Sequence, residues 1–267
     1  MKLTSLVFII LLVFISCKDN ETKDTFESID YFEENYDITT NTYPEPIANV
    51  LNAHGGINTW RKMKTLKFTM IKEAGDEITT TDLENRYSII EMPKHSIGFD
   101  GEIVWLQNKD KTVYEGNPKF YYNLMFYFYA MPFVLADDGI IYEDVNPLYF
   151  EGKVYPGIKM SYEGGVGASP EDEYIIYYDS TTGEMAWLGY TMTYFTKEKS
   201  KKWSFIKYSD WQNVKGLKLP KRLIWFNVEN NLPTTKRNEL NFTNVLLNDA
   251  SKEASYFAMP KNADVVE

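Results

Sequence analysis

The side chains that most often carry out chemistry in proteins are scarce in this chain. Its 267 residues include two histidines and one cysteine. A Ser-His-Asp triad would have to use His54 or His95, and no Gly-x-Ser-x-Gly turn accompanies either of them. A metal site rich in histidine and cysteine also lacks its ligands. The scarcity of these residue types favours a binding protein over an enzyme, and it predicts no cofactor.

Both histidines have structural explanations. His54 is expected at the C-terminus of a helix, where an imidazolium would interact favourably with the helix dipole and bond the last carbonyls. His95 is expected within a strand, as a packed or hydrogen-bonded side chain. A hydrolase that uses a pair of Asp and Glu side chains stays open as an alternative, although no spacing in the chain selects such a pair.

Two further segments resemble ion-binding loops. The glycine-rich stretch 164–170 looks like a phosphate loop, but Pro170 and an acidic run stand where a helix and a lysine are needed. Asp137 and Asp138, with Glu143 nearby, offer oxygen ligands for a hard cation, but their spacing differs from that of an EF-hand. We interpret both segments as turns.

The only cysteine, Cys17, ends a short apolar run that begins just after Lys2, and the small residue Ser16 precedes it. This order is typical of a lipoprotein signal peptide. The apolar run is about half of the roughly 20 residues needed to span a bilayer, so a transmembrane helix is not expected. We predict that residues 1–16 are removed and that lipid on Cys17 anchors the chain to a membrane. An ordinary secretory signal with a chance cysteine is the alternative.

Residues 17–43 are predicted to form an acidic tether. Apolar residues between Phe26 and Tyr36 recur at a nearly helical spacing, so part of the tether could form a helix. The segment Lys18-Asp19-Asn20-Glu21, directly after Cys17, resembles short tags that send some lipoproteins to the outer face of the outer membrane. We expect the chain at the outer membrane, on its periplasmic or its surface face. The formal net charge of −10 argues against nucleic-acid binding, which needs a basic surface.

Residues 44–267 are sufficient for one domain with a substantial core. A helix is predicted to begin after Pro44 and to end at Gly55-Gly56. Alternation of apolar and polar residues then predicts roughly ten strands, separated by turns such as Asp100-Gly101. We predict a mainly β (α+β) fold, in which a large curved antiparallel sheet forms a half-open barrel with helices against its concave face.

An unusually aromatic segment, residues 118–135, interrupts the strands. Pro118 and Pro132 bound a predicted helix of about 14 residues. A helix that is apolar on all sides is buried on both faces or borders a cavity. Aromatic residues make up 16% of the chain, and we expect some of them to line a cavity for an apolar ligand. The candidates for this wall are Trp105, Phe120, Tyr121, Leu124, Phe126, Phe128 and Phe133.

Several short motifs follow one another along the chain. They are His54-Gly55-Gly56 with Trp60, the strand Leu66-Lys67-Phe68, the block 126–135, Tyr177-Tyr178-Asp179, and Asp210-Trp211 followed by 216–220. Together they resemble an uncharacterised family of exported bacterial lipoproteins, which is itself similar to the LolA/LolB-like (outer-membrane lipoprotein carrier) superfamily. The resemblance covers residues 44–260. It implies a half-open barrel that holds lipoproteins or lipids.

Two functions are consistent with these features. In the first, a non-catalytic envelope lipoprotein binds a lipid or acyl chain in its cavity, and the burial of methylene groups drives binding. In the second, the tethered domain binds a glycan or a protein partner of the cell envelope through exposed Trp and Tyr side chains. Aromatic side chains that face a cavity favour the first function.

The anchor prediction can be tested at Cys17. We expect the mature chain to begin at Cys17 with a diacylglyceryl thioether on its sulfur, and Cys17→Ser to give an uncleaved or soluble protein. Intact mass spectrometry of the membrane-extracted protein measures both properties. An unmodified Cys17, or a mature chain that begins after it, would contradict the prediction.

Overall fold

The computed structural model describes residues 43–137, 139–162, 169 and 171–267. The chain divides into two compact units, 1–36 and 37–267, and all described residues belong to the second. The predicted signal peptide, Cys17 and the tether up to residue 42 lie outside the described residues. No helix in the described ranges is long and apolar enough to cross a membrane.

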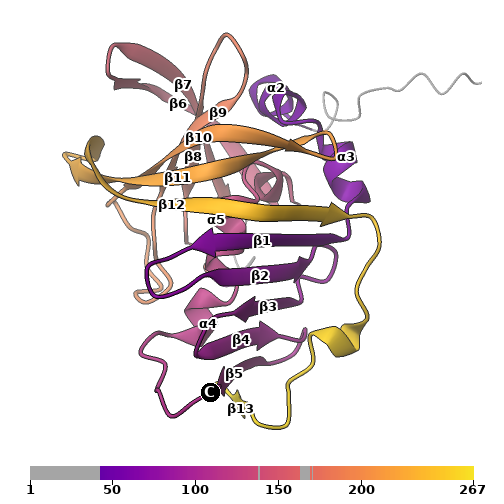
Figure 1. Cartoon of the computed structure of the whole chain (residues 1–267). Helices are drawn as coiled ribbons and strands as arrows, with labels where there is room; N and C mark the ends of the chain where they lie inside the picture. Colours follow the sequence, from indigo (N-terminus) through magenta and orange to yellow (C-terminus); the bar gives the residue numbers. More distant parts are fainter. Residues whose placement is uncertain (1–42, 138, 163–168, 170) are drawn as a thin grey trace, which may run out of the picture. The chain divides into compact units, whose positions relative to one another are not determined.

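The described residues form thirteen strands of one antiparallel sheet (Figure 1). The strands are β1 (Thr65–Ile71), β2 (Glu77–Asp82), β3 (Ser88–Glu91), β4 (His95–Phe99), β5 (Val104–Asn108), β6 (Ile140–Phe150), β7 (Lys153–Tyr162), β8 (Tyr174–Tyr178), β9 (Met185–Tyr190), β10 (Ser204–Val214), β11 (Leu217–Glu229), β12 (Leu232–Asn248) and β13 (Asp264–Val265).

The sheet consists of two meanders that meet at one strand pair. Strands β1 to β5 follow one another on one side, and β6 to β12 on the other, while β12 pairs with β1 in the middle (Figure 1). Strands β13 and β6 are the two edges, so the described sheet does not close into a barrel. The predicted mainly β fold, with a large antiparallel sheet that stays open, is confirmed.

Within the described residues, two helices precede the first strand. Helix α2 (Glu45–Ala53) begins directly after Pro44, and α3 (Ile57–Lys62) follows Gly56, whose φ of 86° suits glycine. Both helices share one core with strands of both meanders. Tyr43 belongs to this core as well, because its hydroxyl donates to the Ala136 carbonyl at 2.8 Å and accepts from Arg61 at 2.9 Å.

The aromatic segment is not the continuous helix that was predicted. It forms two short helices, α4 (Pro118–Tyr121) and α5 (Leu124–Tyr129), and the 3₁₀ helix η1 (Phe133–Ala136). Asn123, between α4 and α5, has φ −127° and ψ 0°, which no α-helix tolerates. The packing partner also changes after α5, since η1 contacts α3 while α5 lies against the sheet.

His54 is a fully buried link between α2 and the second meander. Its Nε2 accepts a hydrogen bond from the Met185 N–H at 3.0 Å, and its Nδ1 lies 3.4 Å from the Lys218 carbonyl oxygen. Burial lowers the pKa of His54 from 6.5 to about 4. The ring is therefore neutral at pH 7, and the expected imidazolium at the helix end is wrong because burial outweighs the dipole.

This histidine should make the domain sensitive to mild acid. The unfolded chain binds a proton below its pKa of 6.5 and the folded chain only near 4, so the stabilisation is complete above pH 6.5 and is lost as the pH falls towards 4. The full effect is up to about 3 kcal/mol. We expect His54→Asn to flatten the dependence of the unfolding free energy on pH between 7.5 and 5, as measured by urea unfolding.

His95→Asn is the matched control. His95 is half-buried in β4, and its Nδ1 lies 3.0 Å from the Asn108 side-chain oxygen. The control should keep the pH dependence of the parent chain. An equal pH dependence in His54→Asn and the parent would show that His54 does not cause it.

Candidate ligand-binding cavity

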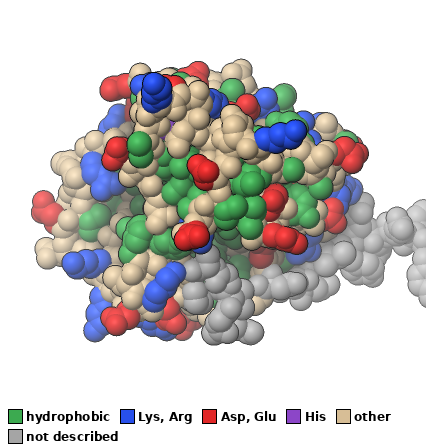
Figure 2. All heavy atoms as spheres, turned by 90° about the horizontal axis from the view of Figure 1, so that it is seen from below, with side chains coloured by type: hydrophobic (Ala, Val, Ile, Leu, Met, Phe, Trp, Pro, Cys, Tyr) green, Lys and Arg blue, Asp and Glu red, His purple; other side chains and the backbone are tan. Residues whose placement is uncertain are grey.

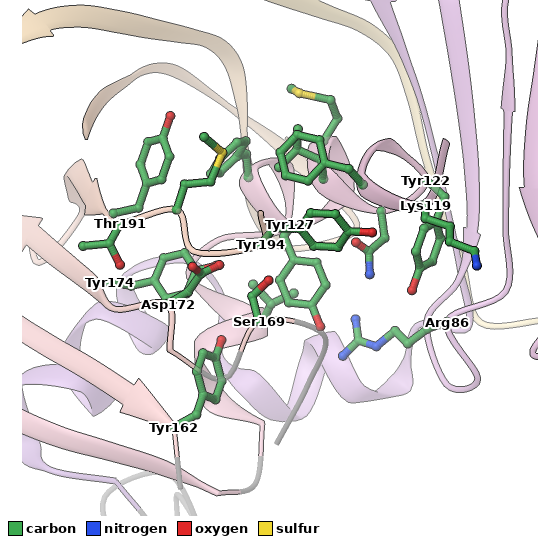
Figure 3. A pocket seen from close by; sticks show the side chains of 18 of the residues that line it. Arg86, Lys119, Tyr122, Tyr127, Tyr162, Ser169, Asp172, Tyr174, Thr191 and Tyr194 are labelled. Carbon is green, nitrogen blue, oxygen red and sulfur yellow. The ribbon is translucent and has the colours of Figure 1, made fainter. Parts of the chain in front are cut away.

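A cavity of about 540 Å³ lies between the aromatic segment and the ends of three strands (Figure 3). One wall comes from α4, α5 and η1, and the other from the end of β7, the start of β8 and the end of β9. The loop after β9, Trp225 of β11, Arg86 and the described residues of the β7–β8 connection also contribute to the lining. A cavity of this size, lined mainly by apolar groups, is typical of sites for small ligands.

Tyrosine is the dominant residue type on the wall. Of the described lining residues, six are tyrosines: Tyr122, Tyr127, Tyr162, Tyr174, Tyr190 and Tyr194. Burial raises the pKa of the first five phenols, so these side chains are neutral hydrogen-bonding groups at neutral pH. The remaining apolar lining consists of Phe120, Leu124, Met125, Phe128, Val134, Met192 and Trp225.

The helical wall is held in place from its far side. The Tyr208 hydroxyl of β10 donates to the Phe128 carbonyl at 2.6 Å, and the ring of Tyr129 stacks on Phe68 of β1 at 4.3 Å. The Asn117 side chain caps α4 by accepting from the Phe120 N–H at 3.0 Å. With its far side bound to the sheet, the segment presents its other side to the cavity.

Three of the seven predicted wall residues line this cavity: Phe120, Leu124 and Phe128. Two others, Phe126 and Phe133, belong to the hydrophobic core, where Phe133 stacks on Trp60 with ring centroids 4.7 Å apart. A helical segment alternates its sides every few residues, so one apolar run supplies both core and cavity wall.

The other two predicted wall residues have different surroundings. Trp105 of β5 is buried against Gly98, and its indole N–H donates to the Phe257 carbonyl at 3.1 Å. The Tyr121 hydroxyl donates to Glu77 at 2.7 Å and accepts from Lys72 at 2.7 Å. Burial raises the pKa of Tyr121 well above its usual range, so it stays a neutral donor.

The strand-end tyrosines were not among the sequence candidates. Tyr162 ends β7, Tyr174 begins β8 and Tyr190 ends β9, and Tyr174 is the register partner of Tyr190. In an antiparallel meander, the end of one strand and the start of the next lie at the same edge. Tyrosines at successive strand ends were thus a readable signal for this wall.

Four of the described lining residues are charged. Arg86 pairs with Asp137, with Nη2 and Oδ2 2.9 Å apart, and Lys119 and Asp172 lie elsewhere on the wall. Asp172 accepts hydrogen bonds from the Thr193 N–H at 2.6 Å and from the Thr193 hydroxyl at 2.7 Å. Burial raises the pKa of Asp172, while its bonds to Thr193 act in the opposite direction.

The segments once compared with ion-binding loops have other surroundings. Residues 163–168 and 170 lie outside the described residues, while Ser169 lines the cavity. Asp137 pairs with Arg86, and Glu143 pairs with Lys159 at 2.7 Å. Among the residues that the structure describes, no three His, Cys, Asp or Glu side chains are grouped so as to hold a metal ion.

Apolar side chains continue beyond the cavity on the loop after β9. The ring of Phe120 packs against Tyr194 and Phe195, each with ring centroids 5.1 Å away. Phe195 is 62% exposed and Met192 52%. In the view of Figure 2, hydrophobic side chains gather near the centre of one face of the molecule. The cavity is thus bordered by an apolar, partly exposed rim.

The chain belongs to the family of unknown function DUF6503, which matches residues 4–232. Comparison with curated proteins found no match.

Comparison with solved structures gave several matches of low sequence identity. A DUF1329 family protein from Desulfovibrio piger is 10% identical, with a TM-score of 0.45 over 80% of this chain and 97% of that one. A LolA superfamily protein from Nitrosomonas europaea is 10% identical, with a TM-score of 0.43 over 74% and 89%. The MucA/MucB complex of Pseudomonas aeruginosa gives 10% identity and a TM-score of 0.24 over 82% and 63%.

The division of the aromatic segment into core and wall predicts unequal costs for the same substitution. Phe133→Ala removes a ring from the core and should lower the unfolding free energy by about 3–5 kcal/mol. Phe120→Ala removes a half-buried ring at the cavity, where little repacking is needed, and should cost less than about 1.5 kcal/mol. Urea unfolding of both variants at pH 7.5 measures the difference. Equal costs would mean that Phe120 is part of a tightly packed core.

Proposed function

We propose that this chain is a non-catalytic lipoprotein of the cell envelope that binds a lipid or acyl chain in the cavity beside α5. The observation that supports this most directly is the wall itself, in which the apolar bodies of tyrosines, phenylalanines and a tryptophan surround about 540 Å³. Such a wall offers many contacts to methylene groups and few specific bonds. No covalent bond changes in this function.

The magnitude of methylene burial is sufficient for useful affinity. Each buried CH₂ contributes about 0.8 kcal/mol, so ten of them supply roughly 8 kcal/mol, which corresponds to micromolar binding before the costs of association. Those costs are several kcal/mol, but a wall already held by the sheet loses little further freedom on binding. The polar tips of the tyrosines remain available to the oxygen-bearing end of a ligand.

The alternative, a surface module for a glycan or a protein, has less support. It relies on exposed Trp and Tyr, whereas of the six tryptophans, all within the described residues, four are buried and two half-buried. Two tyrosines are exposed among the described residues, Tyr149 in the β6–β7 hairpin at 71% and Tyr256 in η2 at 39%, and they lie on different elements. Single exposed aromatic residues are common on soluble proteins and need no ligand.

The proposed location also follows from the N-terminal residues. Lipid on Cys17 would hold the mature chain at the outer membrane. This part of the proposal rests on sequence alone, because these residues lie outside the described part of the chain.

Filling the cavity should abolish binding while sparing the fold. Leu124 lines the wall and is half-buried, so Leu124→Trp places an indole where a ligand would lie. Loss of space for two or more methylenes predicts at least about tenfold weaker uptake of a fluorescent fatty acid. The assay uses residues 17–267 with Cys17→Ser, produced without the signal peptide, and urea unfolding measures whether each variant is folded.

Leu232→Trp is the matched control. Leu232 is 54% exposed at the start of β12 and is absent from the cavity wall. The control should bind the probe as the parent does. If the parent takes up no apolar probe, or if Leu124→Trp binds as well as Leu232→Trp, the cavity is not the binding site and the surface module becomes the better explanation.

A further inference from the structure

One side of the cavity carries a guanidinium held in a defined place. Arg86 lies in the turn between β2 and β3 with φ 63°, and its N–H donates to the Asp82 carbonyl at 3.0 Å. The buried Asp82 carboxylate accepts from the N–H groups of Glu84 and Asn85 at 3.1 and 2.6 Å, which closes the turn. The backbone from which Arg86 projects is therefore fixed before any ligand binds.

The guanidinium has one satisfied end and one unsatisfied end. Nη2 pairs with Asp137, and the group lies over the Phe126 ring, 5.1 Å from its centroid. Nη1 is buried and has no hydrogen-bond partner in the described part of the chain. Figure 3 shows the side chain pointing from the turn toward the tyrosines of the cavity. A buried donor without a partner is costly, so this nitrogen is prepared for an acceptor.

The charges around Nη1 determine which acceptor suits it. Asp137 already neutralises the guanidinium, and a second carboxyl group, Asp172, lines the same cavity. Burial raises the pKa of Tyr127, although the nearby Arg86 acts in the opposite direction, so that phenol stays neutral. A ligand carboxylate would share one cation with Asp137, and like charges side by side are unfavourable. A neutral carbonyl oxygen accepts from Nη1 without this repulsion.

We propose that Arg86 Nη1 donates a hydrogen bond to the carbonyl oxygen of a neutral long-chain acyl ester or amide, whose chain lies along the aromatic wall, so that the cavity prefers acylated molecules over free fatty acids. This inference rests on the proposed function and specifies its ligand class. Glycerides and acylated peptides share this carbonyl chemistry, and separate probes distinguish the two sources.

The test compares four probes on the mature chain carrying Cys17→Ser. The probes are monopalmitoylglycerol, an N-palmitoyl tetrapeptide amide, palmitate at pH 8 and the hydrocarbon dye diphenylhexatriene. We expect one or both carbonyl probes to bind at least about tenfold more tightly than palmitate, in line with a hydrogen bond to a charged donor. The tighter of the two carbonyl probes identifies the source.

Variants of Arg86 and Asp137 test whether Arg86 causes the preference for carbonyl probes over palmitate. Arg86→Met keeps a long side chain over Phe126. It should weaken the binding of the carbonyl probes about tenfold and leave the affinity for diphenylhexatriene unchanged. Arg86→Gln retains an N–H donor and should recover part of the loss. Asp137→Asn removes the competing carboxylate and should strengthen the binding of palmitate. Lys153→Met removes an exposed cation at the start of β7 that is absent from the cavity wall, and it should leave the binding of the carbonyl probes unchanged.

The outcomes separate this inference from the proposed function. Uptake of diphenylhexatriene with equal affinity for palmitate and both carbonyl probes, or unchanged carbonyl binding in Arg86→Met, would overturn the role of Arg86 and leave the apolar site intact. Failure of the parent chain to bind any of the four probes would overturn both proposals.

Discussion

Burial of the aromatic segment between β5 and β6 is the constraint on which the rest of the structure depends. Its far side is held to the sheet, where Tyr208 donates to the Phe128 carbonyl and Phe68 stacks on Tyr129. A segment that is apolar on all sides has a second side to cover. The ends of β7, β8 and β9 face that side across a cavity. The burial that stabilises the domain therefore also creates its candidate site.

The wall combines two kinds of chemistry because its main residue type does so. Tyrosine has a large apolar ring and a polar tip, and burial keeps the phenols neutral. Arg86 and Asp137 add a charged pair whose net charge is zero, and Arg86 Nη1 has no hydrogen-bond partner among the described residues. A cavity with this lining suits a ligand that is mostly hydrocarbon, with a small uncharged polar part, better than it suits an ion.

The second meander is joined to the helices by a few direct contacts between residues far apart in the chain. His54 links the end of α2 to Met185 of β9 and to Lys218 of β11, and a Cβ on Gly55 would meet the Gly216 carbonyl oxygen at 2.1 Å. The motifs that carry the family resemblance include these positions, His54-Gly55-Gly56 and 216–220. They are thus explained by close backbone packing, independent of any ligand.

The sequence by itself determined the open antiparallel sheet, the helix after Pro44 and its end at Gly55-Gly56, because alternation, proline and glycine act over a few residues. It also indicated an aromatic wall around residue 120. Only the tertiary structure decided that Phe120, Leu124 and Phe128 line the cavity while Phe126 and Phe133 enter the core. Which side of an apolar segment meets the sheet depends on strands far away in the chain. Arg86 lines the same cavity for a similar reason. Strand pairing across the sheet places its turn beside α5, and no local sequence pattern indicates this position.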